Sequence, residues 1–224
     1  FFKQKTAYEI PKRDWSSDLC SSDLSAAALL SLPAKPDYAN VAQEAMRGFL
    51  LLGDRQLALA WTTLALQAAY NNARAMMALE RLMPLVMIAG IDKAARLEPQ
   101  DVDRWYEVIR PEDAKAAPLR GNLLLQLFRA TGHDISPRTT TLPEAPPPVR
   151  LVSPAAAILS ALQAAASDKR RAEAALLAAT AIADTALTDL HPAAVGTIVK
   201  ALRDVGEEHA ARLFAVEVAI AHGL

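Results

Sequence analysis

The chain has 224 residues, of which 52% are hydrophobic but only 5% are aromatic, and its 24 basic and 25 acidic side chains leave a formal net charge of −1. A charge so close to neutral argues against a nucleic-acid-binding protein, which needs a basic face to displace counterions from phosphates. No uncharged apolar stretch reaches the length of a membrane span, and the longest, residues 151–167, is predicted to be a buried helix. We therefore expect a soluble chain.

Residues 1–24 differ from the rest of the chain. They carry no helical or strand period and lack the apolar core of a signal peptide. The stretches 3–10 and 14–24 closely resemble, in the right order, the conceptual translation of the two ends of a short-read sequencing adapter, with Leu19 where that translation has Val. The alternative is a genuine disordered tail. The resemblance implies that this segment and its cysteine, Cys20, are non-native, and that residues 25–224 are the C-terminal part of a longer protein.

Residues 25–132 have the composition of packed helices. Alanine and leucine supply most of the apolar residues and favour helix, whereas the β-branched and aromatic runs typical of strands are missing. Gly53 is expected to end a first helix over residues 36–52, and Asp54 to cap a second helix that runs to about residue 70. The second helix carries one inward stripe at helical spacing, formed by Leu57, Ala58, Trp61, Leu64 and Ala65.

Three more helices are expected before residue 132. Asn71 and Asn72 break the chain and cap a helix that ends at Gly90, and Pro84 inside this helix predicts a kink or an early end near Met83. A shorter helix is predicted over 100–109, followed by one over 114–130 that ends at Gly132. Their buried faces are predicted to hold Val102, Trp105, Tyr106 and Ile109 in the former and Leu123, Leu124, Leu127 and Phe128 in the latter.

Residues 133–152 contain five prolines and three consecutive threonines. This composition predicts an extended, polyproline-like linker. The linker is the predicted boundary between a helical-hairpin region over 25–132 and a second one over 153–224.

Four helices are expected after the linker. Ser153 is the predicted N-cap of the first, with Pro154 at its first position, and this helix ends near residue 166. Asp168 is expected to cap a second helix that runs to about residue 184. His191 and Pro192 begin a third that ends at Gly206, and the last covers 207–222. The inward positions of these last two are Val195, Ile198, Val199, Leu202, Ala211, Phe214, Ala215 and Val218.

Loops of two to six residues join most of these helices, and short loops force neighbouring helices to run antiparallel. The sequence therefore predicts an all-α protein built from antiparallel helical hairpins.

Gly53 is followed by Ala58, Trp61 and Ala65, at spacings that let two helices approach closely while one ring fills the gap. This stretch, residues 53–66, resembles the second helix of a tetratricopeptide repeat. The resemblance implies a tetratricopeptide-like fold or an irregular α-solenoid. The same spacing recurs near the C-terminus at Gly206, Ala211, Phe214 and Val218, where Phe214 supplies the aromatic ring. A fainter version without an aromatic residue is formed by Ala172, Ala175 and Ala179.

The resemblance is incomplete in three places. The helix before Gly53 lacks the tryptophan, leucine and glycine of the repeat and keeps only Phe49, at its aromatic position. Tyr70 replaces the closing proline, and Pro84 interrupts the next repeat. Residues 25–224 as a whole also resemble the C-terminal helical region of uncharacterised proteins from GC-rich proteobacteria, a resemblance that implies no activity.

The four histidines, His133, His191, His209 and His222, lack the spacing of metal ligands such as HExxH. His191 is interpreted as a residue at the start of a helix. His209 and His222 are placed on the exposed side or at the end of the last helix, where positive charge suits the helix dipole. Residues 25–224 contain no cysteine, and no phosphate loop or nucleophile elbow is found. We expect no catalytic residue, no cofactor and no metal site.

The carboxylate pairs lie at predicted helix starts or turns, where acidic residues complement the helix N-terminus. A catalytic pair would instead need one carboxyl group in an apolar pocket. The basic run over 168–171 is interpreted as a solvated turn, with contact to an anionic partner as the alternative. The pairs are Glu98/Asp101, Asp101/Asp103, Glu112/Asp113 and Glu207/Glu208.

The large rings Trp61, Trp105 and Tyr106 are predicted to be core residues, with the lining of a peptide groove as the alternative. Four methionines are likewise expected to fill the core, with an adaptable binding surface as the alternative. They are Met76, Met77, Met83 and Met87.

We therefore expect a non-catalytic helical-repeat module for protein–protein interaction or scaffolding, with a protein or peptide partner. The alternative is an accessory helical domain of a bacterial enzyme, for example a cell-wall lytic enzyme, whose catalytic domain lies upstream. A purely structural spacer is the third interpretation.

Overall fold

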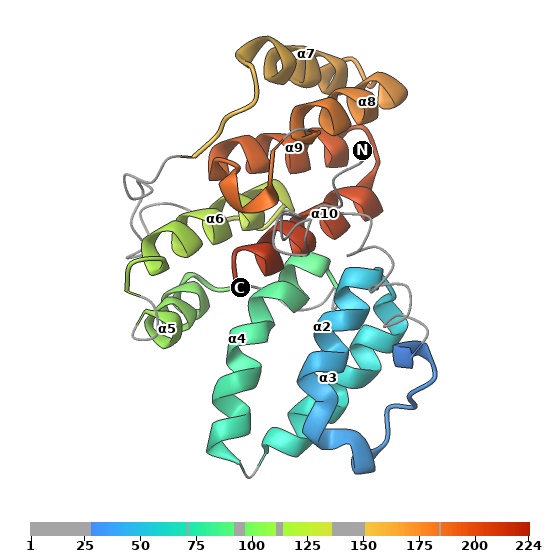
Figure 1. The fold of residues 1–224 in the computed structure, drawn as a ribbon, viewed down its shortest axis with the longest axis vertical. Coiled ribbons are helices and arrows are strands. Elements are labelled where there is room, and N and C mark those ends of the chain that lie inside the picture. Colours follow the sequence, from blue (N-terminus) through green and yellow to red (C-terminus); the bar gives the residue numbers. More distant parts are fainter. Residues whose placement is uncertain (1–27, 71, 92–96, 111–113, 136–150, 184) are drawn as a thin grey trace, which may run out of the picture.

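The computed structural model describes residues 28–70, 72–91, 97–110, 114–135, 151–183 and 185–224 (Figure 1). Over these ranges the regular structure is helical and there is no strand, which confirms the predicted all-α fold. No helix in the described ranges has the length and apolar character that crossing a membrane requires. The predicted tail over 1–24 and most of the predicted linker, residues 136–150, lie outside these ranges.

The first hairpin consists of α2 (Ala42–Leu52) and α3 (Arg55–Ala69), which follow a short 3-10 helix, η1 (Pro36–Val41). The prediction of one helix over 36–52 is wrong at its start, because Tyr38 leaves helical geometry at φ −104° and ψ 16°. Gly53 ends α2 in the left-handed conformation at φ 68°. Asp54 caps α3 by accepting a hydrogen bond of 3.0 Å from the Leu57 N–H. These last two boundaries confirm the prediction.

α4 (Ala73–Ala89) continues through Pro84. Of the two predicted effects of this proline, a kink or an early end near Met83, the early end is wrong. A proline inside a helix lacks the N–H for the carbonyl four residues earlier, and its ring pushes that carbonyl aside. In the same turn, the carbonyl of Arg81 accepts a 3.2 Å hydrogen bond from the indole of Trp105, which belongs to α5 (Pro99–Ile109). A side chain of the next helix thus bonds the backbone of the turn that the proline disturbs.

The other helix ends of the first half follow the sequence signals. Asn72 caps α4 through a 3.1 Å hydrogen bond from the Ala75 N–H, and Gly90 ends it at φ 63°. α6 (Ala117–Ala130) begins three residues later than predicted, with Pro118 in its first turn, and Gly132 follows its end at φ 97°.

α7 (Ala156–Ser167) begins later than the predicted N-cap Ser153. The cause is a backbone pairing just before it. The Val152 N–H donates to the Asp189 carbonyl at 2.7 Å, and the Val152 carbonyl accepts from the His191 N–H at 2.8 Å. This pairing holds the chain extended next to Ser153 and Pro154, so the local start signal is overridden.

α8 (Arg171–Ile182) is not capped by Asp168, which corrects a second predicted helix start. Asp168 is instead the C-cap residue of the preceding helix, and its N–H bonds the Ala164 carbonyl at 3.0 Å. Lys169 then takes a left-handed conformation at φ 59°, and α8 begins two residues later.

The last two helices, α9 (Pro192–Asp204) and α10 (Glu208–Ala221), begin and end close to where they are predicted. The His191 ring caps α9 by accepting a 3.2 Å hydrogen bond from the Ala193 N–H, and Gly206 turns the chain at φ 88°. A short 3-10 helix, η3 (Leu187–Asp189), precedes α9. All eight predicted inward residues of α9 and α10 are buried.

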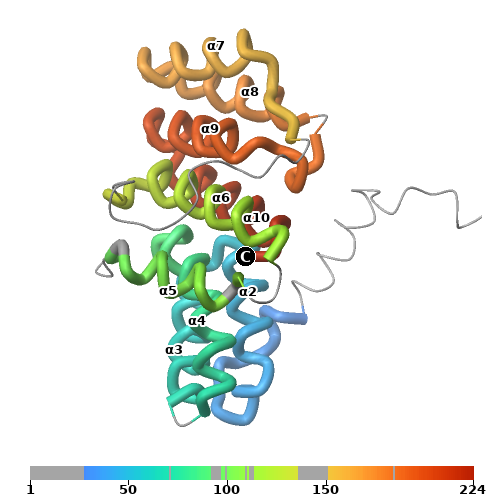
Figure 2. The backbone as a smooth tube through the Cα atoms, turned by 90° about the vertical axis from the view of Figure 1, so that its left-hand side faces the viewer, coloured from blue at the N-terminus to red at the C-terminus, as the bar shows by residue number. Residues whose placement is uncertain are grey.

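The two sides of the predicted linker pack against each other. α2, α3 and α4 run along the long axis of the molecule, α6, α9 and α10 lie across it, and α7 and α8 cover the far end (Figures 1 and 2). α6 packs on α9, and α10 packs on α2, α4 and α9. One core of buried side chains therefore runs through both halves, from Phe49 and Trp61 to Val199 and Val218.

A shared core predicts that the two halves unfold together. All three tryptophans, Trp15, Trp61 and Trp105, precede the linker, whereas the buried Ile198 follows it. We expect Ile198→Ala to cost about 2–5 kcal/mol, the usual effect of a cavity in a core. Because the core is shared, this loss should lower the urea midpoint of tryptophan fluorescence as much as that of far-UV circular dichroism. An unchanged fluorescence midpoint beside a lowered dichroism midpoint would show that the halves unfold separately.

Candidate functional site

The predicted histidines lie apart from one another and have different surroundings. His209 is exposed on α10, as expected, and the His191 ring caps α9. His222 lies at the end of α10 but is half-buried, and its ring contacts the Leu187 carbonyl at 3.1 Å. Burial lowers the pKa of His222, so the positive charge expected for it at this helix end is disfavoured. Within the described ranges, no group of three or more histidine, cysteine or acidic residues could hold a metal ion.

The predicted carboxylate pairs hold local structure. Asp101 accepts a 3.1 Å hydrogen bond from the Glu98 N–H at the start of α5. Glu207 pairs with Arg171, and Glu208 pairs with Arg212 at 2.5 Å. Glu112 and Asp113 lie outside the described residues.

The basic run over 168–171 bonds to its own protein. Arg170 pairs with Asp168 at 3.2 Å and with Glu173 at 2.5 Å. Lys169 donates to the Asp204 carbonyl at 2.6 Å, at the end of α9. This segment thus joins α7, α8 and the end of α9, as expected of a turn rather than of a surface free for an anionic partner.

The large rings and most of the methionines belong to the core. Trp61, Trp105 and Tyr106 are all buried, and Trp61 stacks on Phe49 with ring centroids 6.3 Å apart. Burial confirms their interpretation as core residues. Of the four methionines, Met77 is exposed, Met87 is buried, and the other two are partly buried against the core.

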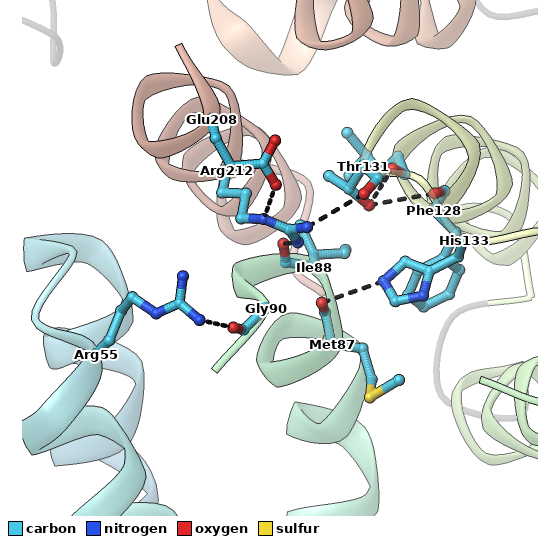
Figure 3. Close-up of polar contacts among 10 residues, drawn as sticks. Arg55, Met87, Ile88, Gly90, Phe128, Thr131, His133, Glu208 and Arg212 are labelled. Carbon is cyan, nitrogen blue, oxygen red and sulfur yellow. Dashed lines mark hydrogen bonds and ion pairs between the residues drawn. The ribbon is translucent and has the colours of Figure 1, made fainter. Parts of the chain in front are cut away.

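A junction of helix ends, which the sequence did not predict, brings distant side chains together (Figure 3). The last turn of α4 ends inside the protein, and its carbonyls accept hydrogen bonds from three other segments. His133, just after α6, contacts the Met87 carbonyl at 3.3 Å. Arg212 of α10 donates to the Ile88 carbonyl at 2.7 Å, and Arg55 of α3 donates to the Gly90 carbonyl. We call these six residues the α4-end junction.

Arg212 connects three helices within this junction. Its Nη1 bonds the end of α4, its Nη2 donates to the Thr131 carbonyl at the end of α6 at 3.2 Å, and its Nε binds Glu208 on its own helix at 2.5 Å. Carbonyls at a helix C-terminus carry partial negative charge and lack partners within the helix. A guanidinium group with five N–H donors in one plane can satisfy two such ends at once.

Glycine at position 90 lets Arg212 reach the end of α4. A Cβ atom at this residue would lie 2.7 Å from the Arg212 guanidinium, closer than van der Waals contact allows. The backbone at Gly90 also has φ 63°, a conformation that glycine adopts without strain. One glycine therefore meets both requirements of the junction.

Beside the junction lies a cleft of about 320 Å³ between α2, α3, the end of α4 and α10. Apolar side chains, among them Phe49, Leu50, Ile91 and Val216, supply most of its lining. Five charged or polar side chains also line it: Asp54, Arg55, Glu208, His209 and Arg212. The cleft is thus mainly apolar, with charged side chains contributed by α3, its cap Asp54 and α10.

Sequence reasoning missed the junction because its partners are far apart in the chain. Arg212 stands 124 residues after Ile88, and nothing in the local pattern links the two. The sequence contained one indication of it. Arg212 directly follows the inward position Ala211, so the aliphatic part of the Arg212 side chain lies near the buried face of α10.

Comparison of the chain with protein-family models, with curated proteins and with solved structures finds no match. Its function must therefore be argued from its own surfaces.

We expect Arg212→Met to destabilise the fold by about 2–3 kcal/mol, because it leaves the Ile88 and Thr131 carbonyls without their donor. Urea denaturation measures the loss. Arg104→Met is the matched control, since Arg104 is exposed and pairs with Asp101 at 3.8 Å, and it should cost less than about 0.5 kcal/mol. Equal losses in the two variants would contradict the role given to Arg212.

The junction also predicts a pH dependence. Burial, with a smaller contribution from the positive charge of Arg212, lowers the pKa of His133 in the folded state from its ordinary value of 6.5. The unfolded chain therefore takes up a proton before the folded chain does. This contribution to stability should be full above about 6.5 and should fall as the pH drops below that value.

Urea titrations across this range measure the slope of stability against pH. His133→Gln removes the titrating ring, so its slope should be smaller than that of the wild type. The slope does not vanish, because burial also lowers the pKa of His222. Parallel curves for the two proteins would contradict the assignment to His133.

Proposed function

We propose that residues 25–224 form a non-catalytic helical module for protein–protein interaction or scaffolding. The observation that carries this proposal is an exposed face on α3. Leu59, Thr63, Leu66 and Tyr70 follow one another at spacings of four, three and four residues, and all four are exposed. We call this row the α3 seam. Leu59 and Leu66 are 47% and 45% exposed, and Tyr70 is 81% exposed.

The composition of α3 makes this face suited to another helix. From Gln56 to Tyr70 the chain contains no charged residue. Apolar residues in alternating steps of three and four are the pattern by which one helix packs along another. Rows of exposed apolar side chains mark interaction sites more often than single ones do.

The first hairpin supports a tetratricopeptide-like arrangement. Ala58 and Ala65, at the small positions of the repeat, are buried, as is Trp61 at the aromatic position. The contact of α10 with α2 and α4 joins helices far apart in the chain, whereas regular repeats contact their sequence neighbours. Among the two predicted forms, we therefore favour an irregular α-solenoid.

Photo-crosslinking in cells of the source organism tests the proposed function. A photoreactive phenylalanine analogue placed at Tyr70 should form an adduct with a defined protein, identified by mass spectrometry. The same analogue at Arg104, an exposed position on α5, is the control and should give no such adduct. An adduct that forms equally at both positions, or at neither, would count against the proposal.

A further inference from the structure

We propose that the partner of the α3 seam is the α3 seam of a second copy of this chain, packed antiparallel to form a two-fold symmetric dimer. This inference rests on the proposed function and names the partner. The seam consists of Leu59, Thr63, Leu66 and Tyr70.

The spacing of the seam favours an antiparallel partner of the same sequence. The steps from Leu59 to Thr63, to Leu66 and to Tyr70 are four, three and four residues, so they read the same in both directions. A second α3 turned end for end therefore places the Tyr70 ring opposite Leu59, and Thr63 opposite Leu66, in both halves of the pair. A contact in which each copy uses the same patch closes as a dimer and does not extend into a filament.

The charge of the seam also permits self-pairing. Two identical surfaces bring like charges together wherever they carry charge, and this costs free energy. α3 has no charged residue after Arg55, and the Arg55 guanidinium is bonded to the Gly90 carbonyl at the α4-end junction. The α3 residues of the seam can thus meet those of another copy without bringing like charges together.

The one polar side chain in the middle of the seam already has a hydrogen-bond partner. The Thr63 hydroxyl donates to the Leu59 carbonyl of its own helix at 2.9 Å. Its methyl group is then free to pack, and covering it leaves no hydroxyl donor unsatisfied. Thr63 is therefore compatible with a buried position opposite Leu66.

The neighbouring surface provides room for the second helix. A shallow groove runs along α3 beside Ala34 and Pro36, and it is lined by Leu59 and Thr63 of the seam together with the uncharged Gln56 and Gln67. Because α3 has only 15 residues, the buried area falls below that of a standard interface, and we expect a reversible dimer with a Kd of about 1–100 μM.

Sedimentation velocity of the full chain over about 1–200 μM, a range around that Kd, measures the dimer. The wild type should shift from monomer to dimer with concentration. Leu66→Glu should remain monomeric, because it places a carboxylate inside the pair. Leu176→Glu is the matched control: Leu176 is 68% exposed on α8, away from α3, so this variant should dimerise like the wild type.

Thermal unfolding of the Leu66→Glu variant checks that it remains folded, as expected for an exposed position. A wild type that stays monomeric throughout, or a Leu66→Glu variant that still dimerises, would overturn the inference. If the wild type is monomeric while the Tyr70 crosslink captures a different protein, the proposed function stands and only the identity of the partner is wrong.

Crosslinking tests the antiparallel orientation. In a chain with Cys20→Ser, the variants Leu59→Cys and Tyr70→Cys are mixed and treated with a short bismaleimide. The antiparallel pair predicts a crosslink between the two variants, with little crosslinking of either variant to itself. Efficient crosslinking of Leu59→Cys to itself would indicate a parallel pair and would overturn the inference.

Discussion

The end of α4 is the constraint on which the arrangement of this protein depends. A helix that stops inside a protein leaves carbonyl groups that need donors from elsewhere. Here the donors come from α3, from the turn after α6 and from α10, through Arg55, His133 and Arg212. Because Arg212 also bonds the end of α6, meeting this requirement holds α10, which follows the predicted linker, against α4 and α6, which precede it. The two halves are thereby held as one packed structure.

Most helices could be predicted because their boundaries are encoded locally. Gly53, Asp54 and Gly90 act within one turn of where they stand, and so does the His191–Pro192 pair. Prediction failed where a distant contact overrides a local signal. Ser153 is a suitable N-cap, yet the pairing of Val152 with residues 189 and 191 keeps the chain extended beside it. The α4-end junction could not be predicted either, because its side chains bond backbone carbonyls that lie 35 to 124 residues away in the chain.

The candidate binding face was also hidden in the sequence, for a different reason. The stripe predicted to face inward, which includes Ala58, Trp61 and Leu64, is buried. The opposite side of α3 is nearly as apolar, with Leu59 and Leu66 among its residues, so hydrophobicity alone does not separate the buried face from the exposed one. What distinguishes the two faces is the packing of α2 and α4 against one of them, which only the structure shows.

The position of α10 has a consequence for how the protein is made. α2, α3 and α4 leave the ribosome long before the helix that packs across α2 and α4 has been synthesised. At a rate of about 5–20 residues per second, the roughly 120 residues between Ile88 and Arg212 take on the order of 10 s to add. During that interval the sides of α2 and α4 that α10 covers in the folded protein have no partner helix. The first three helices can therefore reach their final packing only after α10 has been made.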